Sequence, residues 1–133
     1  MPGTWDAEIK LLTLVDENTR FTAPTVVNGK TFDVLADVEI GADLMKFVTK
    51  HELFVSVLNV STGAPLPGQP IVFSEVLPPQ GNNLPLNREI RLPVAGWKAS
   101  EGDILKAVAS YKVSAGVNTD YSTSDTTNSI VTT

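Results

Sequence analysis

The feature that most constrains the fold of this chain is a strict alternation of apolar and other residues in two segments. Residues 31–40 and 104–113 each place apolar side chains at every second position; these are Phe32, Val34, Ala36, Val38 and Ile40, and Leu105, Ala107, Ala109, Tyr111 and Val113. A period of two is typical of a β-strand with one face in a core and the other largely in water. Antiparallel sheets have this pattern, whereas parallel sheets are covered on both faces. The sequence therefore predicts an all-β protein with antiparallel sheets.

The length of 133 residues fits one domain. A chain of this size buries roughly two thirds of its unfolded surface and needs no metal or disulfide to fold. We therefore expect a single β-sandwich domain over residues 1–133. The chain has no cysteine, which excludes a disulfide framework, a thiolate metal site and a cysteine nucleophile.

The charge balance argues against nucleic acid as a partner. Fifteen acidic and ten basic side chains give a net charge of −5, which opposes binding to phosphate backbones. No stretch approaches the roughly 18 apolar residues of a membrane span, and the first residues lack the basic and apolar regions of a signal peptide. We expect a soluble protein, cytoplasmic or trimmed from an exported one, with the compartment left open.

Turn signals between short apolar segments predict about seven or eight strands. In the first strand, residues 5–11, one face carries Trp5, Ala7, Ile9 and Leu11. Besides this strand and the two segments above, strands are predicted at 23–27, 51–61, 71–77 and 87–94, with a last strand after residue 113. Helical spacing at 41–50 predicts one turn of helix or an irregular crossover. Proline and glycine mark two long loops, 62–70 and 78–86.

The C-terminal segment, residues 114–133, has two readings. Fourteen of its twenty residues are Ser, Thr, Asn or Asp, a composition that a disordered tail would have. Threonine also has a high β-strand propensity, and Ile130 and Val131 are apolar residues that the segment could bury in a core. We favour a closing hairpin strand.

This number and rhythm of strands, with two long mid-chain loops and a closing hairpin, resembles the immunoglobulin-like and fibronectin type III-like folds. The resemblance covers the whole chain at the level of strand count and spacing, and it implies an antiparallel Greek-key β-sandwich. Antibody-type domains carry a cysteine pair, a tryptophan in the third main strand and a tyrosine near the penultimate strand. Here there is no cysteine, and residues 51–61 contain no tryptophan. The tyrosine would be expected four residues after Asp103, where this chain has Ala107. The resemblance therefore implies a cysteine-free sandwich and transfers no residue roles.

His51 is the only histidine, so a histidine metal cluster is excluded and a Ser-His-Asp triad would have to use this residue. It begins an apolar strand beside Glu52, which favours an ordinary strand-end residue. No Gly-x-Ser-x-Gly motif supplies a nucleophile. We predict no catalytic residue of this kind.

Three carboxylates, Asp33, Asp37 and Glu39, share the outward face of one predicted strand, and we interpret them as a solvated acidic face. Calcium needs about six to eight oxygen ligands, which loops supply and a flat strand does not. The alternative cation site is at Glu101 and Asp103, provided that Asp43 or Asp120 lies at the same end of the sheet. A glycosidase pair is a further alternative, but nothing selects two of the fifteen carboxylates. We predict no metal and no cofactor.

Two aromatic residues are candidate ligand contacts. Trp97 lies in a predicted turn, and Tyr121 lies in the polar C-terminal segment. Exposed aromatic rings can stack on sugars or anchor a protein interface. The alternative for Trp97 is a plug at one end of the core. Asn59 begins a glycosylation sequon, which we interpret as silent.

The strand at 51–61 is apolar on both faces, which predicts a central strand or one with a covered second face. Phe54 and Leu58 on that second face are candidate interface residues. One cover would be the 41–50 crossover, which offers Leu44 and Phe47. The other would be a second copy of the chain.

The leading hypothesis is a non-enzymatic module for protein binding or structural spacing. Its contacts would come from the loops at 62–70 and 78–86 or from a sheet edge by strand addition. The first alternative is a carbohydrate-binding module that uses loop aromatics, and the second is a small acid/base hydrolase. We expect a protein partner or self-association.

Overall fold

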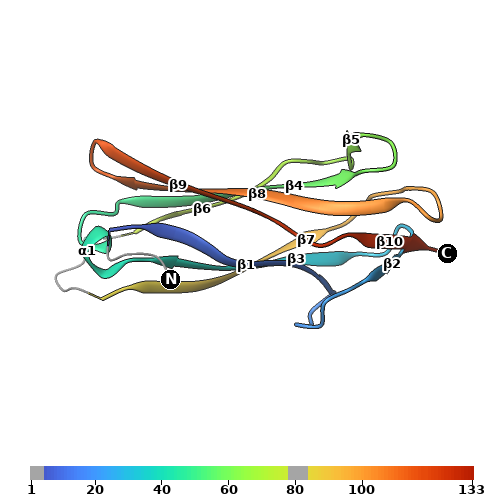
Figure 1. Ribbon diagram of the computed structural model, residues 1–133, viewed down its shortest axis with the longest axis horizontal. Helices are drawn as coiled ribbons and strands as arrows, with labels where there is room; N and C mark the ends of the chain where they lie inside the picture. Colours follow the sequence, from blue (N-terminus) through green and yellow to red (C-terminus); the bar gives the residue numbers. More distant parts are fainter. Residues whose placement is uncertain (1–4, 78–83) are drawn as a thin grey trace.

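A computed structural model describes residues 5–77 and 84–133, which form two facing β-sheets (Figure 1). The smaller sheet has three antiparallel strands in the order β1, β3 and β7, with bounds Ala7–Asp16, Phe32–Ile40 and Leu86–Val94. The larger sheet is built on β4 (Lys50–Asn59) and β8 (Ile104–Ala115), which pair antiparallel along the whole of β4. The predicted all-β class is confirmed.

Shorter strands extend the larger sheet on both sides. Two strands pair with β4, namely β5 (Ala64–Pro65) and β6 (Ile71–Val76). Two pair with β8 one after the other, namely β9 (Asn118–Asp125) and β10 (Ser129–Thr132). β10 also pairs in parallel with β2 (Thr25–Val27). The predicted helical turn is α1 (Ala42–Met45), which links β3 to β4 and thus one sheet to the other.

The core lies between the two segments of alternating apolar residues, which form β3 and β8. Every apolar residue of the predicted inward faces is buried, from Phe32 to Ile40 on β3 and from Leu105 to Val113 on β8. The inward row of β4, which is Leu53, Val55 and Val57, is fully buried between them. The inward assignment of both alternating segments is therefore confirmed.

The described residues form ten strands rather than the predicted seven or eight. One extra strand arises because residues 64–65 of the predicted 62–70 loop pair with β4. Another arises because the polar C-terminal segment forms β9 and β10, so the strand reading of residues 114–133 is confirmed over those spans. Residues 78–83 of the second predicted loop lie outside the described residues.

The first strand departs from its predicted pattern at Lys10. The pairing register of β1 and β3 shifts between Ile9 and Leu11, so Lys10 is the extra residue of a β-bulge. Beyond it Leu12 and Leu14 are buried, whereas Leu11 is 46% exposed. The prediction that Leu11 faces inward was wrong, because the bulge reverses the alternation, so that the buried positions change from Ala7 and Ile9 to Leu12 and Leu14.

The outward face of β3 was predicted to be solvated, and this is wrong at Asp33 and Leu35, which are each only 2% exposed. The segment that follows β1 is held over this face. The Asn18 N–H donates to Asp33 Oδ2 at 2.9 Å, and Arg91 Nη1 donates to the same oxygen at 2.7 Å. Arg91 also bonds the Thr19 carbonyl. A paired carboxylate can be buried at acceptable cost, and the segment that supplies its N–H donor shields it from water.

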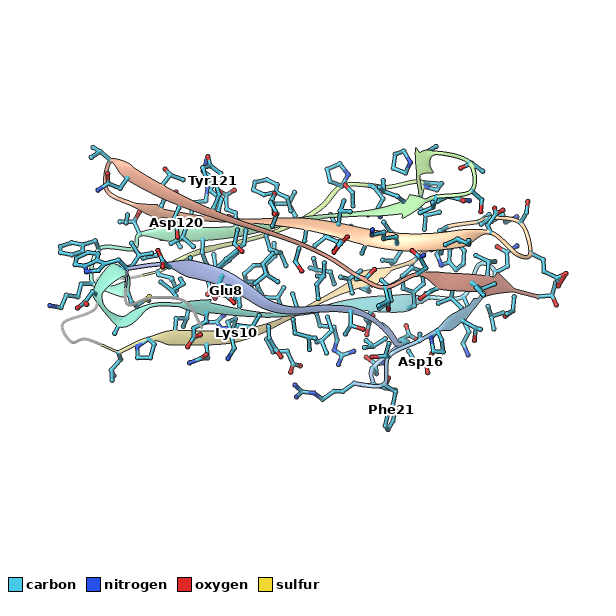
Figure 2. All side chains as sticks on the ribbon, viewed as in Figure 1. Glu8, Lys10, Asp16, Phe21, Asp120 and Tyr121 are labelled. Carbon is cyan, nitrogen blue, oxygen red and sulfur yellow. The ribbon has the colours of Figure 1, made fainter. Side chains whose placement is uncertain are left out.

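Along β1 the two sheets are joined by hydrogen bonds to side chains of β9, and not by main-chain strand pairing. The Ala7 N–H donates to Asp120 Oδ2 at 2.7 Å, and the Ile9 N–H donates to Ser122 Oγ at 3.2 Å. Figure 2 shows Asp120 between β9 and β1, with Tyr121 projecting to the other side of β9. The N–H groups of Ala7 and Ile9 on the free edge of β1 thus have hydrogen-bond acceptors.

Candidate functional site

An apolar hollow of about 650 Å³ lies at the end of the sandwich that holds α1. Three segments line it: the segment before β1 with Trp5, the crossover with Leu44 and Phe47, and the β8–β9 turn with Val117. We call this hollow the aromatic pocket; its remaining lining residues are Thr49, Ala115, Gly116, Asn118, Thr119 and Asp120.

Hydrogen bonds and core packing hold the walls of the pocket in place. The Thr49 N–H donates to the Ser114 carbonyl at 2.9 Å, which fixes the end of the crossover against β8. Leu44 is only 8% exposed and is part of the core, so α1 is anchored by burial. The bond from Ala7 to Asp120 holds the start of β1 beside β9. The pocket is thus a preformed feature of the fold.

The aromatic residues of the pocket are exposed although they are large. Trp5 is 58% exposed and Phe47 is 56% exposed, and their rings stack with centroids 5.9 Å apart at an interplanar angle of 11°. Val117 at the β8–β9 turn is fully exposed. Stacking covers one face of each ring and leaves the other open. Large apolar side chains gathered in this way mark interaction sites in soluble proteins.

The structure places the predicted contact residues in three different settings. Trp97 is 1% exposed, and its Nε1–H donates to the Lys30 carbonyl at 2.9 Å while its ring packs edge-on against Phe32. Trp97 is therefore a core residue, as in the alternative given for it above, and it is not part of the candidate site. Tyr121 is 63% exposed on the outward side of β9.

Phe54 and Leu58 are half-buried on the outer face of β4, which is a central strand of the larger sheet. The crossover does not act as the predicted cover, because Leu44 lies in the core and Phe47 stacks on Trp5. Phe54 instead lines a shallow hollow of about 620 Å³ with Val108 of β8 and residues of β9. The central position of the strand is confirmed.

The acidic candidates do not converge on one site. Asp103 precedes β8 and Asp120 pairs with Val113 near its other end, so the two carboxylates lie at opposite ends of the strand. The condition for the alternative cation site is therefore not met at Asp120. Asp103 Oδ2 accepts hydrogen bonds from Asn59 Nδ2 at 2.8 Å and from the Ser100 N–H at 2.9 Å, which lower its pKa. Within residues 5–77 and 84–133, no three metal-ligating side chains come together.

Asn59, the first residue of the sequon, is 5% exposed. Its side chain donates to Asp103 and accepts from the N–H groups of Ser61 and Thr62. These bonds close the turn after β4. An N-linked oligosaccharide would be attached to Nδ2, the buried atom that donates to Asp103.

Sequence reasoning missed a buried polar network around His51. His51 lies at the start of β4, as predicted, and it is completely buried. Its Nδ1 lies 2.6 Å from the Tyr111 hydroxyl, and its Nε2 lies 2.8 Å from Glu75 Oε1. Glu75 also accepts a hydrogen bond from Arg88 of β7, whose Nη1 lies 2.8 Å from Glu75 Oε1. The network therefore links three strands of the larger sheet to the edge of the smaller one.

The electrostatics of this network suit a structural role. The Arg88 guanidinium and then the His51 ring, both bonded to the Glu75 carboxylate, lower its pKa, so it is ionised at neutral pH. An ionised acceptor favours a proton on His51 Nε2, and His51 Nδ1 on the other side of the ring is paired with the Tyr111 hydroxyl. Burial raises the pKa of Tyr111, so that hydroxyl keeps its proton. Every member of the network has a partner.

No protein-family model matches the chain, and no curated protein matches it either. Within the described part of the chain, none of the helical structure has the length and apolarity needed to cross a bilayer.

Proposed function

We propose that this protein is a non-enzymatic interaction module with an immunoglobulin-like Greek-key fold, and that the aromatic pocket binds an apolar segment of a partner protein. The order of the strands supports the fold assignment. β1, β3 and β7 face a sheet that contains β6, β4, β8 and β9, and the parallel β2–β10 pair joins an early segment to the last strand. Greek-key sandwiches alternate between two antiparallel sheets in this manner.

The observation that carries the functional proposal is the exposed Trp5–Phe47 stack beside a preformed apolar hollow. Burying a large apolar side chain contributes about 1.5–3 kcal/mol, so leaving two of them in water forgoes a substantial stabilisation. Aromatic side chains of this kind are enriched among the residues that dominate binding energy at protein interfaces. The volume of about 650 Å³ accommodates one or two large side chains.

The chemistry of the walls favours an apolar occupant. Leu44, Ala115 and Val117 supply aliphatic surface beside the two rings. The carboxylate of Asp120 already accepts the Ala7 N–H, so it is engaged within the fold. A short segment with one protruding aromatic or branched aliphatic residue matches this lining.

The two tryptophans make a direct test available, because one lies in the pocket and the other in the core. We would titrate the ¹⁵N-labelled protein with capped pentapeptides that differ in one central residue, and follow both indole N–H signals by NMR. The Trp5 signal should shift on addition of peptides with a central Phe, Trp or Leu, while the Trp97 signal stays in place. Peptides with a central Ser or Lys should leave both signals unmoved.

A matched pair of substitutions locates the effect. Phe47→Ala removes one ring of the stack, whereas Phe21→Ala removes a ring that is 74% exposed and projects from the far side of the molecule (Figure 2). Phe47→Ala should abolish the shift of the Trp5 signal, and Phe21→Ala should preserve it. Equal losses in the two variants, or no shift with any apolar peptide, would contradict the proposal.

A carbohydrate is the second candidate ligand, and polar groups beside the rings favour it. Thr49, Asn118 and Thr119 line the pocket together with Trp5. A pyranose could stack on the Trp5 ring while its hydroxyls bond these side chains. Titration with neutral oligosaccharides in place of peptides distinguishes the two ligands. Under this alternative Asn118→Ala should weaken the Trp5 shift as much as Phe47→Ala does.

A further inference from the structure

The outer face of the larger sheet carries a hollow that the proposed function does not use. Its volume is about 620 Å³, and Phe54 of β4, Val108 of β8 and Thr123 of β9 are part of its lining. Within the described part of the chain, it has no lining residue in common with the aromatic pocket. Its size falls in the range of small-molecule sites. The hollow is therefore a separate candidate ligand site.

The strand pairing sets one aromatic ring and two hydroxyl groups in a single row across this hollow. Phe54 is opposite Ser110 in the β4–β8 pair, and Ser110 is opposite Thr123 in the β8–β9 pair. Directly paired residues of adjacent strands point to the same face of a sheet and lie about 5 Å apart. Ser56, two residues beyond Phe54 on that face, adds a third hydroxyl to the lining. The hollow is thus aromatic on the β4 side and rich in hydroxyls beside it.

The three hydroxyl groups are available to a ligand. Ser56 and Ser110 are half-buried, and Thr123 is exposed. Among residues 5–77 and 84–133, none of the three hydroxyls has a hydrogen-bond partner. A hydroxyl group donates one hydrogen bond and accepts two. Such a row suits a ligand whose own polar groups are hydroxyls, because each contact can form in either direction.

The hollow carries no unbalanced charge. The ionisable side chain in its lining is Asp125, which forms an ion pair with Lys106 at 2.8 Å. The hydrogen bond from Lys106 lowers the pKa of Asp125, so the carboxylate stays ionised and offsets the lysine at neutral pH. In the neighbouring row, Glu52 and Lys112 stand opposite each other. A neutral ligand therefore fits this place better than an ionic one.

The main chain beneath the hollow is already used by the sheet. β4 pairs with β6 on one side and with β8 on the other, and β8 pairs with β4 and β9. A peptide that adds to a sheet as a strand needs the free N–H and C=O groups of an edge. These central strands offer none, so the contacts to a ligand here come from side chains.

We propose that this hollow binds a neutral oligosaccharide, with one pyranose ring packed on Phe54 and its hydroxyls bonded to Ser110 and Thr123. A pyranose has apolar C–H groups on its face and hydroxyls around its rim, so it needs an apolar aromatic surface beside unpaired hydroxyl groups. Tyr121 precedes Thr123 by two residues on the same face of β9, and its exposed side chain projects away from the sandwich (Figure 2). Its ring offers a stacking surface to a second sugar unit.

The test is a titration of the ¹⁵N-labelled full chain with neutral tetrasaccharides of glucose, of mannose and of N-acetylglucosamine, followed by NMR. At least one of them should shift the amide signals of Phe54, Ser110 and Thr123, while the indole N–H signal of Trp5 stays in place. A shift of the Trp5 signal alone would put the sugar in the aromatic pocket and overturn the proposal. So would the absence of any shift with all the tetrasaccharides up to about 10 mM.

Matched substitutions on β9 locate the bound sugar. Thr123→Val removes one hydroxyl and keeps the shape of the side chain, so it should raise the dissociation constant about threefold to tenfold. The control is Thr119→Val, the same change on the same face of β9 but outside this hollow, and it should leave the affinity unchanged. Thr119 lines the aromatic pocket, so an effect of Thr119→Val without one of Thr123→Val would refute the assignment.

A substitution of Phe54 tests the stacking surface. Phe54→Leu keeps an apolar side chain on the central strand but removes the ring, and it should weaken binding at least about threefold. An affinity equal to that of wild type, in a variant with an unchanged melting midpoint, would contradict the role of the ring. If Phe54→Leu fails to fold, the two threonine variants decide the question. Whether a peptide binds in the aromatic pocket has no bearing on these results.

Discussion

Removal of the Tyr111 hydroxyl should destabilise the protein far more than the loss of one oxygen atom suggests. In Tyr111→Phe the ring keeps its place in the core, but His51 Nδ1 loses its hydrogen-bond partner, the Tyr111 hydroxyl 2.6 Å away. Both side chains are completely buried, so water cannot replace the bond. An unsatisfied buried polar atom costs about 1–3 kcal/mol. For a domain of this size about 1 kcal/mol lowers the melting midpoint by about 4 °C, so we expect a decrease of about 4–12 °C.

The double substitution separates this explanation from simple loss of packing. His51→Leu alone leaves the Tyr111 hydroxyl without an acceptor and should cost a similar amount. In the combined variant neither polar atom remains, and Glu75 keeps its ion pair with Arg88. The double variant should therefore be less destabilised than the sum of the single variants by about 1 kcal/mol or more. Urea unfolding of the four proteins measures this coupling, and costs that add within about 0.5 kcal/mol would refute the reasoning.

Three other expectations can be checked by unfolding experiments. Val38→Asp places an unpaired charge in the core and should cost at least about 3 kcal/mol, whereas an unchanged midpoint would refute the inward assignment of β3. Since the folded-state pKa of Glu75 lies below its ordinary value of 4.5, its contribution to stability is present above that pH and is lost as pH falls through the lower folded-state pKa. Glu75→Gln should therefore flatten the acid side of the stability profile, and a slope equal to that of wild type would count against the bond to Arg88. A chelator should move the melting midpoint by less than about 5 °C, and a larger decrease would reveal a structural metal.

The parts of the fold that could be predicted are those in which burial determines the order of apolar and polar residues along the chain. The inward rows of β3 and β8 have a period of two because every second side chain enters the core. The bulge at Lys10 was missed because the predicted strand ended at Leu11, and the change of apolar positions to Leu12 and Leu14 lies beyond that end. The burial of Asp33 was equally hidden, since its partner Arg91 is 58 positions away in the chain.

The candidate site was harder to predict than the core. Trp5 and Phe47 lie far apart in the sequence. Their rings come into contact because the segment before β1 packs beside the crossover between β3 and β4. An exposed aromatic residue and a buried one look alike in a sequence, which is why Trp97 was a candidate contact residue and Trp5 was not. The partners of His51 come from two other strands, Tyr111 from β8 and Glu75 from β6, so its burial depends on pairings that no local pattern records.

The parallel pairing of β2 with β10 has a consequence for how the chain folds during synthesis. Thr25 pairs with Ile130, so β2 leaves the ribosome about a hundred residues before its partner exists. At about 5–20 residues per second this delay lasts on the order of 5–20 s. The nascent chain can complete the three-stranded sheet once β7 has emerged, but the seam between β2 and β10 closes only after synthesis is nearly finished. A ribosome-bound chain halted before Ser129 should therefore show protected amides in β3 and unprotected amides in β2.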